Sequence, residues 1–457
     1  MSHELSIGFE KDLGTLLVGV DTLWGGNVKG SAAERFILDN WVSGKALPEI
    51  YDDPLAQELR AREGVLGNVD TETVRTFVRK YNLRDLPDAV RGSVTSFEYF
   101  RQRFVENLVG ALEVMLHTAL GKQGLRSLPS FDERRRATTQ ESNINLVPVE
   151  PLQEQLRLAL NKAGVDSTEK NTRDRYLAWK RERVIAPEKV GEEVQHIKDE
   201  LFERLKTRFL TRYHDTFNDY SQLDDLTLQG HTFQTTKDKG YTGFTQYDGG
   251  EDEQGRPLLK GLFEFNVDHP VTREKLYHLT AHEVIAHYFS CVMRDLSYRS
   301  GWQGIETTMG TMCSPEVALE EGLAETMLYL LYGSRERTIK ELGLGMGIEL
   351  AANDLENAAK YNVGILHLRE GRSIDEVKAY VAEQCLLDDA LVDKMSRVWA
   401  QHPIFSPMYG PAYHYGAQVV QAAASHLSPE KVLRLGLHLD GLLDIDTFGE
   451  KVKKALI

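Results

Sequence analysis

The spacing of apolar residues predicts helices through most of the first half of the chain. From Ser96 to Leu120, apolar side chains recur at steps of three and four residues, the pattern of a helix with one buried face. A second long helix is predicted from about Glu192 to Tyr213. The intervening residues 127–150 are rich in Pro, Ser, Thr and Asn and predict a long loop, in which the run Arg134–Arg136 is expected to be solvated.

The pattern changes after about residue 222. Apolar and polar residues alternate from Leu258 to Val267, which predicts a half-buried strand inside a small sheet over residues 226–267. Apolar helices are predicted again over 271–293 and 315–332, and further helices continue to the C-terminus. We therefore expect a helix-rich α+β protein of two lobes, an N-terminal helical lobe (1–220) and a lobe carrying the chemistry (221–457).

Both apolar helices in the second half have start signals. Asp268 is a candidate N-cap for the first, with Pro270 in its first turn. The second has a stronger signal, because Ser314 is followed directly by Pro315, and Gly333 is a plausible end.

The net charge and the cysteines exclude some classes of partner and of metal site. The formal net charge is −15, with 69 acidic against 54 basic residues, which argues against nucleic acid or an anionic membrane as the main partner. The three cysteines, Cys291, Cys313 and Cys385, have no regular spacing and predict neither a disulfide framework nor a thiolate metal site. No signal peptide or membrane span is expected from the sequence, so the cytoplasm is the predicted compartment.

The first apolar helix carries the segment His282-Glu283-Val284-Ile285-Ala286-His287. Two histidines five residues apart would lie about 140° apart around a regular helix, too far to share a metal ion. One inserted residue, a π-type bulge near Val284 to Ala286, would bring them together, and such bulges favour functional sites. His278, four residues before His282, offers a competing pair with ordinary helical geometry.

The second apolar helix contains three acids, Glu320, Glu321 and Glu325, that need partners if they are buried. Glu321 and Glu325 are four residues apart and so share a face. Two histidines and one carboxylate would hold a zinc ion and leave a fourth position for water. A second acid one turn away could orient a ligand histidine, and Glu320 points elsewhere, toward solvent or substrate.

These two motifs resemble those of gluzincin metallopeptidases whose metal motif is lengthened to His-Glu-x-x-x-His. The resemblance is to the dipeptidyl-peptidase III family and to the tubulin tyrosine carboxypeptidase family, whose bacterial relatives carry Gln-Glu-Gly-Leu-Ala. Glu321-Gly322-Leu323-Ala324 matches the second family, with Glu320 in place of its Gln, whereas Gly322 and Leu323 depart from the first. The resemblance covers roughly residues 262–333 and implies a zincin-like two-lobed fold with a zinc ion. By it, His282, His287 and Glu321 are zinc ligands, Glu283 is the catalytic base, and Glu325 holds a ligand histidine.

Two further groups of residues could border such a site. Amide hydrolysis builds an oxyanion that a Tyr or His donor can stabilise, and the segment Tyr409–Gly416 offers four donors, of which we favour Tyr415 or His414. Arg299 and Trp302 lie between the two metal-bearing helices, where we expect ordinary surface packing.

The sequence thus predicts a zinc-dependent peptidase. Its action could be that of an exopeptidase such as a carboxypeptidase. The expected substrate is an extended peptide or protein segment added to an exposed sheet edge, for which the Leu258–Val267 strand is a candidate. An acidic tubulin tail is a poor match for an acidic protein. The alternatives are a non-catalytic helical scaffold, another metal-dependent hydrolase, or an iron site of two histidines and one carboxylate. The oligomeric state is left open.

Overall fold

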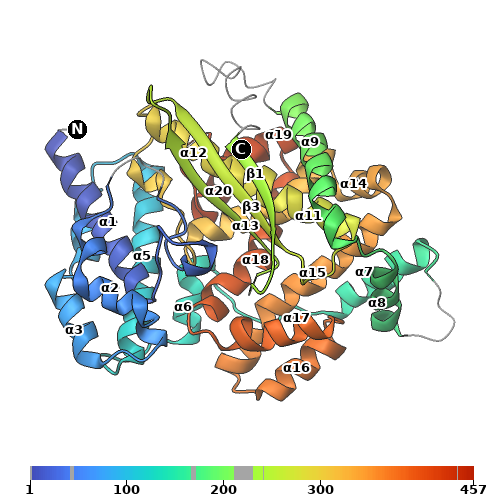
Figure 1. Cartoon of the computed structure of the whole chain (residues 1–457), viewed down its shortest axis with the longest axis horizontal. Helices are drawn as coiled ribbons and strands as arrows, with labels where there is room; N and C mark the ends of the chain where they lie inside the picture. Colours follow the sequence, from blue (N-terminus) through green and yellow to red (C-terminus); the bar gives the residue numbers. More distant parts are fainter. Residues whose placement is uncertain are drawn as a thin grey trace.

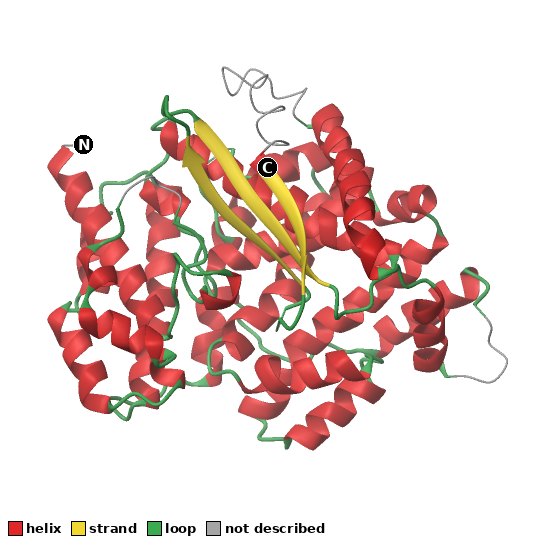
Figure 2. Ribbon diagram, viewed as in Figure 1, coloured by secondary structure: helices red, strands yellow, loops and turns green. Residues whose placement is uncertain are grey.

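The structure is a computed structural model that describes residues 3–41, 46–165, 171–209, 230–239, 241–439 and 441–456. Most of the chain is helical, and one small sheet lies over the helices on the near face in Figures 1 and 2, so the predicted helix-rich α+β class is confirmed. Within these residues, no helix combines the length and the apolar character that a membrane span requires.

The N-terminal lobe, blue in Figure 1, is built from helices that pack into a core of their own. Its long central helix α5 matches the predicted periodic segment within two or three residues. The core extends to Ile305, Met309 and Met408, which fixes this lobe to the rest of the chain. The helices of this lobe are α1 (His3–Leu23), α2 (Pro54–Ala61), α3 (Thr71–Lys80), α4 (Leu86–Ser93) and α5 (Tyr99–Lys122).

The sheet has the strand order β1-β3-β2, with β1 (His231–Thr236), β2 (Gly243–Glu251) and β3 (Pro257–Asn266). β1 pairs parallel with β3, and β2 pairs antiparallel with it. The alternating pattern of β3 is confirmed, since Phe263 and Phe265 are fully buried. Its predicted role as an exposed edge is wrong, because β3 is the central strand and β2 is an edge of this three-stranded sheet.

The packing divides the chain earlier than the predicted boundary at residue 220, which itself lies outside the described residues. Helix α9 (Val190–Arg208) packs on the sheet and on the helical segment that carries His282 and His287, and it lies beside α11 in Figure 1. Helices α7 (Glu150–Lys162) and α8 (Thr172–Glu182) pack with the C-terminal half. The fully buried N-terminal members of the first core therefore end in α5, whereas α7, α8 and α9 pack in the other cores, which they share with residues after 230.

The predicted loop 127–150 contains helix α6 (Phe131–Thr139), which begins at the capping box of Ser130 and Glu133. The prediction of a solvated arginine run there is wrong for two of its three members. Arg135 is fully buried, with its guanidinium carbon 3.8 Å from the ring centre of Tyr361, and Arg134 donates to a backbone carbonyl of the C-terminal half.

The C-terminal half is a stack of helices around α13 and α15. Its elements are α11 (Arg273–Thr280), η6 (Ala281–Tyr288), α12 (Phe289–Arg299), α13 (Pro315–Tyr332), α14 (Arg335–Leu342), α15 (Leu344–Gly364), η8 (Ile365–Arg369), α16 (Ile374–Glu383), α17 (Asp389–Lys394), η9 (Met395–Trp399), η10 (Phe405–Tyr409), α18 (Gly410–Ala424), α19 (Pro429–Gly436) and α20 (Ile445–Leu456).

Two glycines let α13 and α18 approach closely. A Cβ at Gly322 would lie 2.3 Å from the backbone carbon of Gly416, and a Cβ at Gly416 would lie 2.0 Å from the carbonyl oxygen of Ala318. Neither position has room for a side chain, so these glycines set the distance between the two helices. The contact brings the start of α18 against the acidic face of α13.

Candidate metal centre

The segment that carries His282 and His287 is one continuous helical stretch with a π-helical centre. α11 begins at Thr272, whose side-chain oxygen accepts from the Lys275 amide at 3.1 Å, and not at the predicted cap Asp268. The middle, η6, has π-helical geometry from Ala281 to Tyr288, and α12 continues it as a regular helix. The predicted wide turn around residues 284–286 is therefore confirmed.

The π-turn places His282 and His287 on the same face. Their Nε2 atoms lie 3.1 Å apart although the residues are five apart in sequence. Glu321 reaches them from α13, which has the predicted Ser314 cap, Pro315 in its first turn and Gly333 at its end. Its Oε2 lies 3.3 Å from His282 Nε2 and 3.8 Å from His287 Nε2.

The chemistry of these donors fits a zinc ion. Ligand bonds of about 2.0–2.1 Å in a tetrahedral arrangement put ligand atoms about 3.3–3.4 Å apart, and the three separations of 3.1, 3.3 and 3.8 Å bracket that value. Glu321 Oε2 is buried without any hydrogen-bond donor among the described residues. A buried carboxylate oxygen without a donor is costly unless a cation lies beside it.

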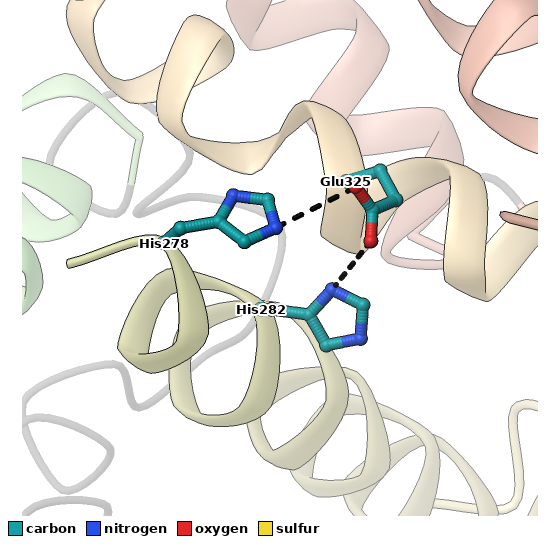
Figure 3. A group of neighbouring side chains, drawn as sticks. All are labelled: His278, His282 and Glu325. Carbon is teal, nitrogen blue, oxygen red and sulfur yellow. Dashed lines mark ion pairs between the residues drawn. The ribbon is translucent and has the colours of Figure 1, made fainter. Parts of the chain in front are cut away.

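Glu325 lies behind His282, as predicted for an orienting acid. Its carboxylate faces His282 Nδ1 at 3.4 Å and His278 Nε2 at 3.5 Å (Figure 3). It also accepts from the side-chain amides of Asn353 and Asn357, at 2.5 and 2.8 Å. Since His282 turns Nδ1 toward Glu325, its Nε2 is left to face Glu321.

The competing i, i+4 pair, His278 and His282, also clusters with a carboxylate within ligand distance, that of Glu325. That carboxylate is already engaged by two amide donors, whereas Glu321 keeps one oxygen without a donor. His278 is almost fully buried, while the side chain of His287 is 20% exposed. The group His282, His287 and Glu321 is thus the better candidate for a site that also admits water.

The charges of the cluster are strongly coupled. Although burial opposes it, the carboxylates of Glu321 and Glu325 raise the pKa of His282 to about 10. Burial also raises the pKa of the Glu321 carboxyl, but the imidazoles of His282 and His287 have the larger effect and hold this pKa well below its ordinary value. In the absence of a cation the site would therefore take up protons on its histidines, and a divalent ion can replace them.

Glu283 follows His282 and lines the same cavity. Its backbone carbonyl accepts from Thr245 Oγ1 at 3.0 Å, which ties the π-helical turn to strand β2. Its Oε1 would lie 3.6 Å from a Cβ at Gly243, the first residue of β2. The edge strand therefore passes directly beside the predicted base.

Glu320 also lines the cavity, but a guanidinium engages it. Arg294, fully buried, donates to Glu320, lies 2.8 Å from Glu316 Oε1 and donates to the Thr307 carbonyl at 2.7 Å. The carboxylate of Glu320 thus helps to join α12 to α13. Arg299 pairs with Asp295 and Glu251, and Trp302 is 50% exposed, so both show the ordinary surface packing that we expected.

The tyrosines beside Glu321 at the candidate metal centre are Tyr409 and Tyr413, which corrects the preference for His414 or Tyr415. Tyr409 donates its hydroxyl to Glu321 Oε1 at 2.7 Å, and the two tyrosine hydroxyls are 2.9 Å apart. Burial and the charge of Glu321 raise the pKa of each hydroxyl well above its ordinary value, so both remain donors.

His414 and Tyr415 are absent from the cavity lining because α18 turns them away. A step of one residue rotates a side chain by about 100°, and a step of four returns it to nearly the same face. His414 contacts Gln418 at 2.9 Å and the ring of Tyr361, while Tyr415 packs in the core. The i, i+4 spacing of Tyr409 and Tyr413 was the signal in the sequence that could have identified the right pair.

The cavity around these groups has a volume of about 610 Å³ and is lined by both lobes. Sequence reasoning missed Asp39 and Asn40 of the N-terminal lobe, and the polar side chains that α15 presents to the cavity. A polar stripe at helical spacing in an otherwise buried helix was the available signal for the latter, whose members are Glu349, Asn353, Glu356 and Lys360.

Comparisons with known proteins identify no family. No family model matches the sequence, and no curated protein matches it. The chain is similar to the crystal structure of a candidate lipoprotein from Colwellia psychrerythraea, at 12% identity and a TM-score of 0.48 over 86% of this chain and 71% of that one. It is also similar to a candidate lipoprotein of unknown function from Shewanella oneidensis, at 13% identity and a TM-score of 0.46 over 87% and 77%. Similarity at this level carries no argument about function.

Proposed function

We propose that this protein is a zinc-dependent peptidase in which His282, His287 and Glu321 hold the metal and Glu283 is the catalytic base. The observation that carries the proposal is the convergence of two imidazole nitrogens and one donor-free carboxylate oxygen within 3.1–3.8 Å on a cavity wall. The metal, when bound, would act as a Lewis acid and lower the pKa of a water molecule.

The other groups of the site have separate tasks. Glu283 accepts the proton of the attacking water and returns it to the leaving amine. Tyr409 holds one oxygen of Glu321, so that the other oxygen keeps its direction. Tyr409 already donates its hydroxyl proton to Glu321, so Tyr413 is the donor in the hydrogen bond between the two tyrosines. The Tyr413 hydroxyl can instead donate to an oxyanion of the substrate.

The substrate in this proposal is an extended peptide that pairs with the free edge of β2. This strand passes Glu283 at Gly243, and its backbone groups on that side are not paired within the three-stranded sheet. The edge replaces β3 as the binding strand that the sequence suggested. Phosphate-rich partners fit less well, because Asp39, Glu283 and Glu320 line the same cavity.

A cytoplasmic location accompanies this proposal. All three cysteines are free, and two of them are buried. Unpaired thiols suit a reducing compartment. Cell fractionation with an antibody to the native protein would test the compartment.

The test combines metal analysis with turnover. We expect about one zinc per chain by mass spectrometry and cleavage of a diverse peptide library by the zinc-loaded protein. Glu283→Gln should keep the zinc and lose nearly all cleavage, because the ligands survive while proton transfer does not. Glu274→Gln on α11, outside the cavity lining, is the matched control and should retain both.

Each of three outcomes would overturn the proposal and favour a different function. A protein that takes up no zinc or other divalent metal would be a helical scaffold with a buried polar network. Iron uptake in preference to zinc would favour an oxygen-using two-histidine, one-carboxylate site. A zinc protein that cleaves no peptide but hydrolyses other acyl or phosphoryl compounds would be a different metal-dependent hydrolase.

A further inference from the structure

The lining of the cavity includes four lysines, Lys180, Lys275, Lys360 and Lys394. Three of them have carboxylate partners. Lys180 lies 2.7 Å from Asp388, whereas Lys275 and Lys360 share Glu356 at 3.5 and 3.4 Å. Their positive charges are therefore largely balanced by the protein itself.

Lys394, at the end of α17, differs from the other three. Among the described residues its ammonium has no carboxylate within ion-pair distance, and its hydrogen bond is a long one, 3.5 Å to Thr242 Oγ1. Burial lowers the pKa of Lys394 to about 8, with Glu356 opposing this effect and the lysines at 275 and 360 adding to it. A half-buried ammonium without a counter-ion gains from an anion placed beside it.

The position of Lys394 relative to the metal centre follows from β2. Its contact Thr242 directly precedes Gly243, which adjoins Glu283. Adjacent Cα atoms are about 3.8 Å apart, so Lys394 and Glu283 approach neighbouring positions of one chain segment. Lys394 and Glu283 also line the same cavity, so a peptide bound along this segment would pass both side chains.

Strand direction decides which end of a peptide lies there. A peptide pairing antiparallel with the edge of β2 runs from the Tyr247 side toward Thr242. Its residues on the carboxyl side of the bond at Glu283 therefore approach Lys394. Leu391 and Val398, three residues before and four residues after Lys394, line the same cavity.

We infer that Lys394 binds a substrate carboxylate on the carboxyl side of the cleaved bond. The carboxylate can be the end of the peptide chain or the side chain of an Asp or Glu, since both present the same group. This inference rests on the proposed peptidase function and narrows its substrates to peptides that are anionic on that side.

The test measures binding, so that it does not depend on turnover. The probes are three N-acetylated penta-alanine peptides: one with a free C-terminal carboxylate, one amidated, and one amidated with Glu as its last residue. Their dissociation constants are measured by calorimetry on zinc-loaded Glu283→Gln protein, with and without Lys394→Met. Lys378→Met, at a side chain 43% exposed on α16 outside the cavity lining, is the matched control.

We expect at least one carboxylate peptide to bind about tenfold or more tightly than the plain amide, as for a charge-assisted hydrogen bond. Lys394→Met should remove this advantage, and Lys378→Met should keep it. The free acid and the Glu-amide distinguish a terminal carboxylate from a side chain. If Lys394→Met lowers the melting temperature, Lys394→Gln serves in its place.

Two results would overturn the inference: equal affinity for all three peptides, or an advantage that survives in both Lys394 variants. Failure of the peptidase function would look different. The zinc-loaded wild-type protein would then cleave neither the three peptides nor any peptide of a broader library. The preference for carboxylate peptides that depends on Lys394 would remain.

Discussion

Glu321 and Glu325 lie one turn apart on α13, but their carboxylates have different numbers of donors. Glu321 accepts one hydrogen bond, from Tyr409, and its second oxygen is left facing two imidazole nitrogens. Glu325 receives two amide donors and faces the imidazoles of His278 and His282, of which His282 also faces Glu321. The comparison teaches that burial and spacing alone do not distinguish a ligand from an orienting group, whereas a buried oxygen without a hydrogen-bond donor does.

The largest expected effect is at the carboxylate with the free oxygen. Glu321→Ala should reduce bound zinc to background and abolish peptide cleavage, since two histidines alone make an incomplete site. Zinc content after dialysis against a chelator checks this. Glu316→Gln, a buried and ion-paired acid on the same helix, should retain zinc. Full zinc retention in Glu321→Ala would contradict the ligand assignment.

Glu325→Gln should weaken the site without removing it. The amide keeps the shape but loses the charge that orients His282, and changes of this kind reduce metal affinity or activity about 10–100-fold. Chelator competition measures the zinc affinity. If Glu325→Gln loses zinc as completely as Glu321→Ala does, the two acids have the same role and the distinction fails.

The amide donors of Glu325 should have smaller effects. Asn353→Ala and Asn357→Ala each remove one hydrogen bond to a charged group, and we expect each to weaken zinc binding about two- to tenfold. Because both amides bind the same carboxylate, the double variant should not show the simple sum of the two effects. Asn362→Ala, on the same helix but bonded to Val147, is the control and should leave zinc affinity unchanged.

The parts of this site that the sequence predicted are local. The caps of α13, the π-turn between His282 and His287, and the position of Glu325 one turn after Glu321 depend on neighbours within a few residues. Periodicity and capping residues carry that information along a single helix.

The parts that the sequence missed depend on contacts between distant helices. The choice of Tyr409 and Tyr413 over their neighbours follows from how α18 packs on α13 at Gly322 and Gly416. The packing of α7, α8 and α9 with the C-terminal half likewise depends on contacts between distant helices. The helices before residue 210 are amphipathic whether they belong to the N-terminal lobe or to the C-terminal half. Only their packing shows that α9 lies against the sheet.

The smallest expected effect on zinc binding is at His278, which forms the competing i, i+4 pair with His282. Its Nε2 lies 3.5 Å from Glu325, a carboxylate that retains its amide donors when the ring is removed. His278→Ala should therefore keep one zinc per chain and lower the free energy of unfolding by about 1–3 kcal/mol, the cost of a lost buried polar partner. Thermal unfolding with and without zinc separates the two effects, because a ligand stabilises only a protein that still binds it. His287→Ala is the counterpart and should lose the zinc. The opposite pattern, zinc lost in His278→Ala and retained in His287→Ala, would assign the metal to the regular i, i+4 pair and to Glu325, and would leave the π-turn without its proposed role.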